Sequence, residues 1–359
     1  MTAKEKKQRV FVALSGGVDS AVTAALLQKQ GFNVIGVFIK IWQPEFVECT
    51  WKEDRLDAIR VAVVLGIPFR EIDLSNAYKE QVVGAMLADY ASGITPNPDV
   101  LCNRFIKFGA LWEWAQKEGA DFIATGHHAR IRKNGDGAYS LIRGVDEGKD
   151  QSYFLWQLTQ NDLEHTLMPV GELQKKAVRA LAEKYNLPVA GKPDSQGLCF
   201  VGDINMQDFL KKLIMVKPGK VITADGDEIG RHSGAELYTI GQRHGFEVYN
   251  KGVTSEPRYV SKVDVQKNTL TVSKKKEDIT AKKAVLSSVN WVREGAKKED
   301  DFEGTCQLRY RQPPQMCRFE ENGKEGSVHF KETQIVVPGQ SLVLYRKDEC
   351  IAGGIIVGV

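Results

Sequence analysis

Six consecutive residues near the start of the chain, Ser15-Gly16-Gly17-Val18-Asp19-Ser20, have the composition of an anion-binding loop. They follow a β-branched run over 9–14 and precede a helical stretch over 21–30, so the sequence predicts strand, Gly-rich turn and helix. Adjacent glycines let backbone N–H groups approach an anion, the helix directs its positive end at it, and the serine hydroxyls add donors. The predicted chemistry is phosphate binding, with a tight turn carrying incidental serines as the structural alternative.

Two cysteines lie in segments that suit a reactive thiol. Cys102 follows Asn97-Pro98-Asp99 at the predicted start of an amphipathic helix, where the helix N-terminus and Arg104 favour the thiolate. A buried structural cysteine is the alternative for this segment. Cys199 lies in a Gly-flanked polar loop over 194–202, a composition typical of exposed, movable loops. The absence of a CxxC pair argues against a zinc ribbon or disulfide framework, so we expect no metal site and interpret Cys49, Cys306, Cys317 and Cys350 as structural.

The elements that must position these residues alternate in type over the first 200 residues. Strand-like runs over 9–14, 33–39, 69–74 and 121–125 are separated by helical runs over 54–65, 78–91 and 105–118. This order predicts an α/β fold with a doubly wound parallel sheet, helices on both faces and ligands beyond the carboxyl ends of the strands. The Gly-rich turn and the Gly126-His127-His128 turn both follow such ends.

The pattern changes after about residue 200. A helical run over 206–213 precedes short alternating segments over 220–223, 237–240, 258–265 and 269–272. Further short strands over 284–289, 305–309, 326–330 and 341–345 are separated by Gly, Pro and Asn turns. The chain is therefore predicted to hold a nucleotide domain over 1–203, a small mixed central domain over 204–282 and a β-barrel or sandwich over 283–359.

Composition limits the class of protein. With 359 residues, 42% hydrophobic and 26% charged, the chain should fold into two or three domains. It has no apolar run of the roughly 18 residues that a membrane span needs, and its charged first ten residues do not resemble a signal peptide, so we expect a cytoplasmic protein without a membrane partner. Ten basic residues face four acidic ones between Lys262 and Lys298, followed by Arg309-Tyr310-Arg311. This permits a polyanionic partner, with a solvated lysine face as the alternative.

Seven segments together resemble one family, the bacterial tRNA-specific 2-thiouridylases, within the PP-loop ATP pyrophosphatases. They are SGGVDS, NPDVLCNRFIKFG, ATGHHAR, KDQSYFLW, MPVGELQK, SQGLCFVG and YTIGQRHG, in this order along nearly the whole chain. The resemblance implies a PP-loop domain, a small central domain and a tRNA-binding carboxyl-terminal β-barrel. It also implies ATP-dependent 2-thiolation of the wobble uridine of tRNA, with release of AMP and pyrophosphate.

The resemblance implies a role for each matching residue. ATP and its Mg²⁺ are expected at Ala13, Leu14, Ser15, Gly16, Gly17, Val18, Asp19, Ser20, Ile39 and Gly126, with Asp19 helping to hold the metal and Ile39 beside the adenine. The target base is expected at Asn97, Pro98 and Asp99, with Asp99 as general acid or base. Cys199 would carry a persulfide and Cys102 would be the partner thiol, leaving a disulfide between them after transfer. Contacts with tRNA are expected from His127, Lys149, Asp150, Gln151, Arg311, Gln312 and Gln340.

Two partners follow from the same resemblance: the anticodon stem-loop of tRNA, and a persulfide-donating relay protein or cysteine desulfurase. The sequence departs from the usual family pattern at Leu14, Ala21 and Ile39, which affects the packing of the nucleotide pocket. Two rival functions remain at this point. A PP-loop ligase of a small metabolite has no need of the paired thiols or of a basic carboxyl-terminal region, and an RNA-binding protein with the nucleotide fold as scaffold would consume no ATP.

Overall fold

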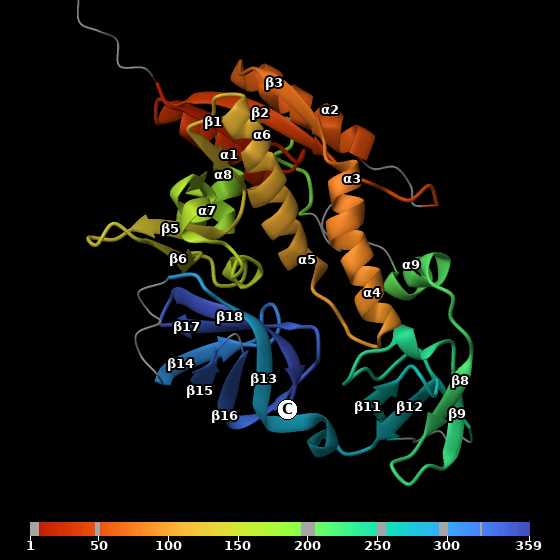
Figure 1. Cartoon of the computed structure of the whole chain (residues 1–359). Helices are drawn as coiled ribbons and strands as arrows, with labels where there is room; N and C mark the ends of the chain where they lie inside the picture. Colours follow the sequence, from red (N-terminus) through yellow and green to blue (C-terminus); the bar gives the residue numbers. More distant parts are fainter. Residues whose placement is uncertain (1–6, 47–50, 195–204, 250–255, 294–300, 324) are drawn as a thin grey trace, which may run out of the picture.

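The computed structural model describes residues 7–46, 51–194, 205–249, 256–293, 301–323 and 325–359 (Figure 1). Three sheets organise these residues: two have five strands each, and an eight-stranded sheet joins two strands within 129–143 to the carboxyl-terminal strands. No helix in the described ranges has both the length and the apolar character that crossing a bilayer would need.

The first sheet is parallel throughout and has the order β3-β2-β1-β4-β7. Its strands are β1 (Arg9–Ala13), β2 (Asn33–Lys40), β3 (Phe69–Asp73), β4 (Phe122–Ala124) and β7 (Thr166–Leu167). The first four confirm the predicted strands, whereas the two-residue β7 has no periodicity that would reveal it. Because β1 and β4 are neighbours, the two glycine-containing turns that follow them lie side by side.

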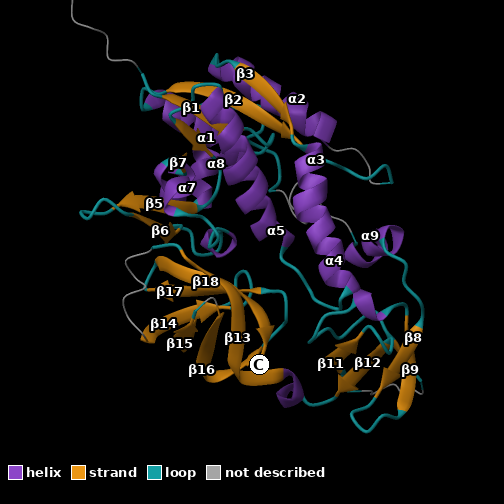
Figure 2. Ribbon diagram, viewed as in Figure 1, coloured by secondary structure: helices purple, strands orange, loops and turns teal. Residues whose placement is uncertain are grey.

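Helices cover both faces of this sheet, which confirms the doubly wound arrangement (Figure 2). One face packs against α1 (Val18–Lys29), α2 (Trp51–Leu65) and α8 (Lys175–Lys184). The other packs against two helical rods, the first formed by α3 (Ser75–Tyr78), η1 (Lys79–Gly84) and α4 (Ala85–Ala91), the second by α5 (Pro98–Leu101), η2 (Cys102–Ala110) and α6 (Leu111–Lys117). Along β1, Val10 and Val12 pack on the first face and Phe11 on the second, as strand alternation requires.

A β-hairpin that the sequence analysis did not predict leaves the first domain after β4. Its strands are β5 (Ala129–Lys133) and β6 (Tyr139–Arg143), joined by a turn over 134–138. Short elements complete this part of the chain: η3 (Ser152–Phe154), α7 (Gln160–Glu164) and η4 (Pro169–Glu172). The turn contains Asn134-Gly135-Asp136-Gly137, and both Asn-Gly and Asp-Gly are typical of hairpins, so the signal was present in the sequence.

The central domain joins one helix to a mixed five-stranded sheet of order β10-β9-β8-β12-β11. Its elements are α9 (Met206–Leu213), β8 (Gly219–Ile222), β9 (Glu228–His232), η5 (Ala235–Leu237), β10 (Glu247–Val248), β11 (Tyr259–Asp264), β12 (Thr269–Ser273) and η6 (Lys276–Ile279). The predicted strand over 237–240 is wrong. Gly234, at φ +152°, turns the chain into η5, and this 3₁₀ turn buries Ala235, Leu237 and Tyr238 without strand pairing.

The carboxyl-terminal part is a closed antiparallel barrel, which excludes the sandwich alternative. Its strands are β13 (Thr280–Trp291), β14 (Asp301–Gln307), β15 (Gln315–Asn322), β16 (Glu325–Ile335), β17 (Ser341–Arg346) and β18 (Glu349–Gly358). Pairing of β13 with β18 closes the ring, and β6 of the hairpin pairs with β18 through Leu141 opposite Cys350. The barrel sheet therefore extends into the first domain. Cys306, Cys317 and Cys350 are buried within it, in line with a structural role.

Trp156 lies at the centre of the contact between the first domain and the barrel. Its side chain is fully buried, and its Nε1 donates to Ser341 Oγ at 2.9 Å. Asn290 of β13 donates to the Trp156 carbonyl at 2.7 Å. Gly353 of β18 lies directly on the indole, since a Cβ there would stand 2.6 Å from the nearest ring carbon. A side chain at position 353 would therefore clash with the buried indole unless one of the two shifts.

We predict that Gly353→Ala lowers the free energy of unfolding by about 1–3 kcal/mol, because the added methyl overpacks the buried indole. Gly358→Ala on the same strand is the matched control, because a Cβ there meets nothing within 4 Å. Its effect should stay within about 0.5 kcal/mol. Urea unfolding of both variants measures the difference, and equal losses would contradict the tight contact.

Candidate active site

The Gly-rich turn forms a cradle between β1 and α1. Helix α1 begins at Val18, three residues earlier than predicted, so that Asp19 and Ser20 lie in its first turn. Ser20 Oγ accepts from the backbone N–H of Ser15 at 3.2 Å and donates to the Gly17 carbonyl at 3.0 Å, which holds the loop in a curve. Gly16 has φ +73°, a conformation that favours glycine. The loop geometry fits the predicted phosphate cradle.

Two neighbouring segments pack closely on the cradle. A Cβ on Gly126 would stand 2.6 Å from the Ser20 backbone nitrogen, and a Cβ on Gly16 would stand 2.4 Å from the Asp54 carbonyl oxygen of α2. Only glycine allows either approach. The turn after β4 and the start of α2 therefore wall the cradle. Among the predicted nucleotide residues, Ala13 ends β1, Leu14 follows it and Ile39 lies on β2. Leu14 and Ile39 are buried on opposite faces of the sheet.

Asp19 faces two groups that the sequence analysis did not assign to the site. Lys175 Nζ lies 2.6 Å and 2.7 Å from its two carboxylate oxygens, and His128 Nε2 lies 3.2 Å from Oδ1. Burial acts to raise the pKa of Asp19, but the hydrogen bonds from His128 and Lys175 and their charges outweigh it and lower the pKa. The Asp19 carboxylate is therefore held ionised at the mouth of the cradle, as a group expected to help hold Mg²⁺ must be.

Asp194 extends this arrangement into a network of ion pairs. It accepts from Lys149 Nζ at 2.5 Å and Arg179 Nη2 at 2.6 Å, and Lys175 Nζ lies 2.9 Å away. Burial acts to raise the pKa of Asp194, while the hydrogen bonds from Lys149 and Lys175 dominate and hold it at about 2. Lys175 is thus shared between the carboxylates of Asp19 and Asp194.

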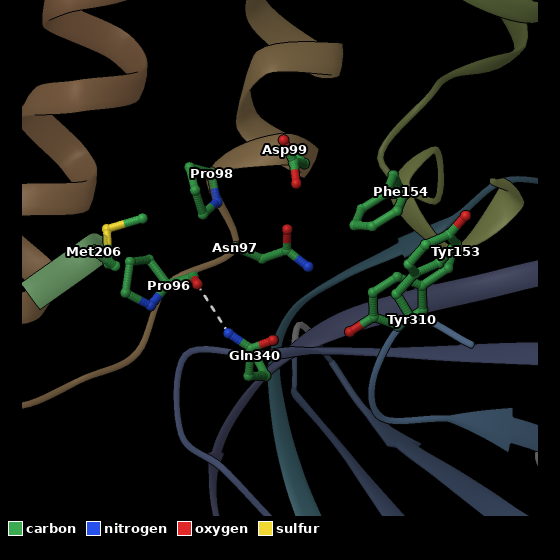
Figure 3. Close-up of a pocket in the computed structure, with 9 residues that line it drawn as sticks. All are labelled: Pro96, Asn97, Pro98, Asp99, Tyr153, Phe154, Met206, Tyr310 and Gln340. Atoms are coloured by element: carbon green, nitrogen blue, oxygen red, sulfur yellow. Dashed lines mark hydrogen bonds between the residues drawn. The ribbon is translucent and has the colours of Figure 1, made fainter. Parts of the chain in front are cut away.

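A pocket of about 290 Å³ lies where the three domains meet, close to the lower size limit of small-ligand sites, about 300 Å³. Its lining comes from all three: Pro96, Asn97, Pro98, Asp99, Tyr153, Phe154, Met206, Tyr310 and Gln340. Figure 3 shows the side chains of Asn97 and Asp99 directed into the space that the aromatic rings bound on one side. The rings of Phe154 and Tyr310 lie 4.6 Å apart between centroids. The structure thus brings the predicted base-contacting residues together with Gln340.

Hydrogen bonds fix the walls of this pocket. Gln340 Nε2 donates to the carbonyls of Thr95 at 2.9 Å and Pro96 at 2.8 Å, and Asn103 Nδ2 donates to the Phe154 carbonyl at 3.1 Å. The Tyr153 hydroxyl donates to Ser341 O at 2.9 Å. The chain before Asp99, the aromatic segment and the barrel are therefore tied to one another around the pocket.

Cys102 lies one helical turn after Asp99, at the start of η2, and is fully buried. Residues two apart on a helix point in different directions, so Arg104 and Cys102 do not lie on one face of the helix. The Arg104 side chain is exposed and its guanidinium lies 5.0 Å from the ring centroid of Phe105. The helix also begins at Pro98, so Cys102 stands beyond its first turn. The predicted partner, Cys199, lies in 195–204, and Cys49 in 47–50, outside the described residues.

Several predicted tRNA contacts have internal partners in this structure. His127 is only 7% exposed and its Nδ1 lies 2.8 Å from Thr125 Oγ1; burial, followed by the charges of Lys107 and His128, lowers its pKa well below the usual value. Asp150 is buried and pairs with Arg143 at 3.0 Å, and Gln151 accepts from the His128 backbone. These three side chains hold the first domain together around the hairpin. Their contact with tRNA stays a prediction.

The remaining predicted contacts lie on the barrel. Arg311 is exposed over the Tyr310 ring, 5.1 Å from its centroid, and Gln312 is hydrogen-bonded to Leu308 and Gln334. The lysines of the basic segment that the structure describes all have exposed side chains: Lys262, Lys267, Lys274, Lys275, Lys276, Lys282 and Lys283. Exposure agrees with both the polyanion and the solvated-face interpretations. Among described residues, no group of three or more His, Cys, Asp or Glu side chains is arranged to hold a metal.

Comparison with known proteins gives matches to three successive parts of the chain. Profiles described as "tRNA methyl transferase HUP domain", "tRNA methyl transferase PRC-barrel domain" and "Aminomethyltransferase beta-barrel domain" match residues 8–203, 207–274 and 281–356. A curated relative from Streptococcus uberis, "tRNA-specific 2-thiouridylase MnmA", is 42% identical over 356 residues, which cover 98% of this chain and 95% of the relative. The chain belongs to the tRNA-specific 2-thiouridylase family. The expected membership of a family of tRNA sulfurtransferases is thereby confirmed.

Two solved structures resemble the thiouridylase chain over about half its length. The NMN synthetase of Francisella tularensis is 18% identical with a TM-score of 0.34, covering 53% of this chain and 67% of that one. The U34-tRNA thiolase NcsA of Methanococcus maripaludis is 20% identical with a TM-score of 0.35, covering 57% and 66%. At these scores the assignment rests on the sequence matches.

The sequence analysis missed four groups at the two sites. Lys175 and Phe154 are inside segments that carried the resemblance to the thiouridylases, MPVGELQK and KDQSYFLW, and His128 is inside ATGHHAR. Asp194 directly precedes SQGLCFVG. The segments that contain or adjoin these groups were therefore recognised. The sequence around Lys175 does not indicate that its side chain contacts Asp19, which is 156 residues away.

We predict that Asp194 contributes acid-dependent stability. Its pKa is about 2 in the folded chain against an ordinary 3.8, so its contribution is complete above about pH 4 and is lost as the pH falls toward 2. Between pH 5 and pH 2.5 the free energy of unfolding of Asp194→Asn should therefore fall less than that of the native chain. Asp225→Asn, at an exposed aspartate on the β8–β9 turn, should follow the native curve. Urea unfolding across this range is the measurement, and parallel curves for all three proteins would refute the network.

Proposed function

We propose that this thiouridylase catalyses the ATP-dependent 2-thiolation of the wobble uridine of tRNA. ATP activates the C2 oxygen as an adenylate, sulfur from a cysteine persulfide replaces it, and AMP and pyrophosphate are released. This proposal is supported by two features that one member of this family combines: a glycine-rich turn at the start of α1, and a pocket of about 290 Å³ lined by aromatic rings, where Asp99 lies one turn from Cys102.

The chemistry explains why one chain needs both sites. The C2 oxygen of uracil is a poor leaving group, so sulfur cannot displace it directly. Transfer of AMP to that oxygen makes it a good leaving group, and ATP supplies the AMP. Pyrophosphate leaves in this step, and donors around it stabilise its developing charge. The cradle over 15–20 would take the phosphates, and Asp19 with Mg²⁺ would neutralise them.

The pocket suits a base taken out of its stack. An enzyme that acts on C2 must remove the nucleotide from the anticodon stack, and aromatic faces stabilise a base in that state. Phe154 and Tyr310 offer such faces, while the polar groups of Asn97 and Asp99 point at the same space. Asp99, which lines the pocket, would exchange a proton with the base as general acid or base. The anticodon stem-loop would lie along the barrel and the exposed lysines, whose positive charges would neutralise its phosphates.

Sulfur transfer has two routes that balance. In one, the terminal sulfur of the Cys199 persulfide adds to C2 and AMP leaves; Cys102 thiolate then attacks the Cys199 sulfur, which breaks the S–S bond and leaves sulfur on the base. In the other, Cys102 attacks the persulfide first and releases hydrosulfide, which adds to C2. Both end with a Cys102–Cys199 disulfide that an external thiol reduces. A persulfide-donating relay protein or cysteine desulfurase would reload Cys199. The proposed site of action is the cytoplasm.

Separate measurement of the two half-reactions tests this function. Cys199→Ser should abolish thiolated tRNA, detected by mass spectrometry of the nucleosides, while tRNA-dependent pyrophosphate release persists, because the adenylation step uses no thiol. Cys49→Ser, outside both motifs, should retain both activities. Thiolation by Cys199→Ser would disprove the persulfide assignment, and an absence of tRNA-dependent pyrophosphate release from the native chain would disprove the proposed function.

We predict that Tyr310→Ala lowers kcat/KM for an anticodon stem-loop by about 5- to 100-fold, the range for loss of one base–aromatic stack. Tyr310→Phe keeps the ring and should stay close to native activity. A stem-loop with 2-aminopurine at the wobble position should lose its fluorescence quenching in Tyr310→Ala alone. Tyr249→Ala, at an exposed aromatic of the central domain, serves as control. Unchanged quenching in Tyr310→Ala would place the base elsewhere.

A further inference from the structure

The ion-pair network around Lys175 has an arrangement that structural support alone does not require. Lys175 is 8% exposed, so its ammonium group is largely removed from water. Its three nearest carboxylate oxygens, two on Asp19 and one on Asp194, all lie within 2.9 Å. Burial of a lysine is costly, and this site supplies two carboxylates for one ammonium.

Each carboxylate keeps another partner if Lys175 moves away. Asp194 retains Lys149 Nζ at 2.5 Å and Arg179 Nη2 at 2.6 Å, and Asp19 retains His128 Nε2 at 3.2 Å. A bound Mg²⁺ would also take over the charge of Asp19. Lys175 can therefore change partner without leaving either carboxylate unpaired, and it is the cation of the network that contacts both of them.

The position of Lys175 beside the cradle is fixed by the backbone. It is the first residue of α8, and its N–H donates to Asp146 Oδ2 at 2.8 Å. Helix α8 packs against α1, the helix that begins in the cradle, through Val178 and Ala182. The side chain is thus directed at Asp19, two residues after Gly17 of the phosphate loop.

We infer that Lys175 is a phosphate-binding residue. When ATP binds, its ammonium group moves away from Asp19 and Asp194 and contacts the phosphates that will depart as pyrophosphate. This inference rests on the proposed function and adds to it a residue from a distant segment. In the free protein the two carboxylates hold the ammonium in place, and the arriving phosphates exchange with them. The lysine would then neutralise charge that develops as pyrophosphate departs, without forming a covalent bond.

Nucleotide binding without tRNA tests the inference. Lys175→Gln should weaken binding of Mg·ATP by about 10- to 100-fold, the range for loss of a charge-assisted hydrogen bond, and should change binding of AMP by less than about twofold. Lys176→Gln is the matched control, because Lys176 is the next residue of α8 and its side chain is exposed. It should bind both nucleotides as the native chain does. Calorimetry gives the dissociation constants.

Three outcomes would overturn the inference: native ATP affinity in Lys175→Gln, an equal loss for ATP and AMP, or the same loss in Lys176→Gln. If Lys175→Gln does not fold, Asp194→Asn replaces it. This substitution removes one carboxylate that competes with phosphate for the Lys175 ammonium, so it should strengthen ATP binding severalfold and leave AMP binding unchanged. Weaker ATP binding would contradict the exchange of carboxylate for phosphate. A native chain that binds no ATP would instead refute the proposed function, so the two failures are distinguishable.

Discussion

The geometry of the candidate site depends on one short turn being held between two other domains. The chain over 92–97 connects α4 to α5, and the Gln340 amide of the barrel donates to two successive carbonyls of it, at 2.9 and 2.8 Å. On its other side, the hydroxyls of Thr95 and Thr239 of the central domain lie 2.8 Å apart. Helix α5 starts directly after this turn, so the direction in which Asp99 and Cys102 face follows from these contacts. The pocket exists only where the three domains meet.

The nucleotide end of the site is organised by charge rather than by packing. Asp19, Lys149 and Asp194 come from three separate segments and Lys175 and Arg179 from helix α8, and the five side chains meet in a partly buried network. In such surroundings an unpaired charge is expensive, and a fully paired network fixes the conformation of the loops that contribute to it. The cradle loop is therefore held in shape before a nucleotide arrives, which lowers the reorganisation that binding would otherwise require.

Much of the fold could be predicted because its signals are local. The β-branched run of β1 and the glycine turn after it predict a strand, a loop and a helix from neighbouring residues. The predicted range of α9 agrees with the structure at both ends. The 3₁₀ turn at 235–237 was not predicted, because its apolar residues also suit a strand. The glycine at 234 turns the chain away from an extended conformation. The aromatic pocket could not be predicted at all. Its walls come from positions as distant as Pro96 and Gln340, and no local pattern records that they meet.

The pairing of β6 with β18 joins the first domain and the barrel through one continuous sheet. If the chain ended before β13, the backbone groups of Leu141 and Ile142 that face β18 would form a bare edge, open to pairing with another molecule. Trp156 and Tyr153 would lose the barrel surface that buries them, so a large apolar patch would face water beside that edge. The barrel thus covers both a strand edge and an apolar surface of the domain that precedes it, and a chain truncated before β13 would expose the two together.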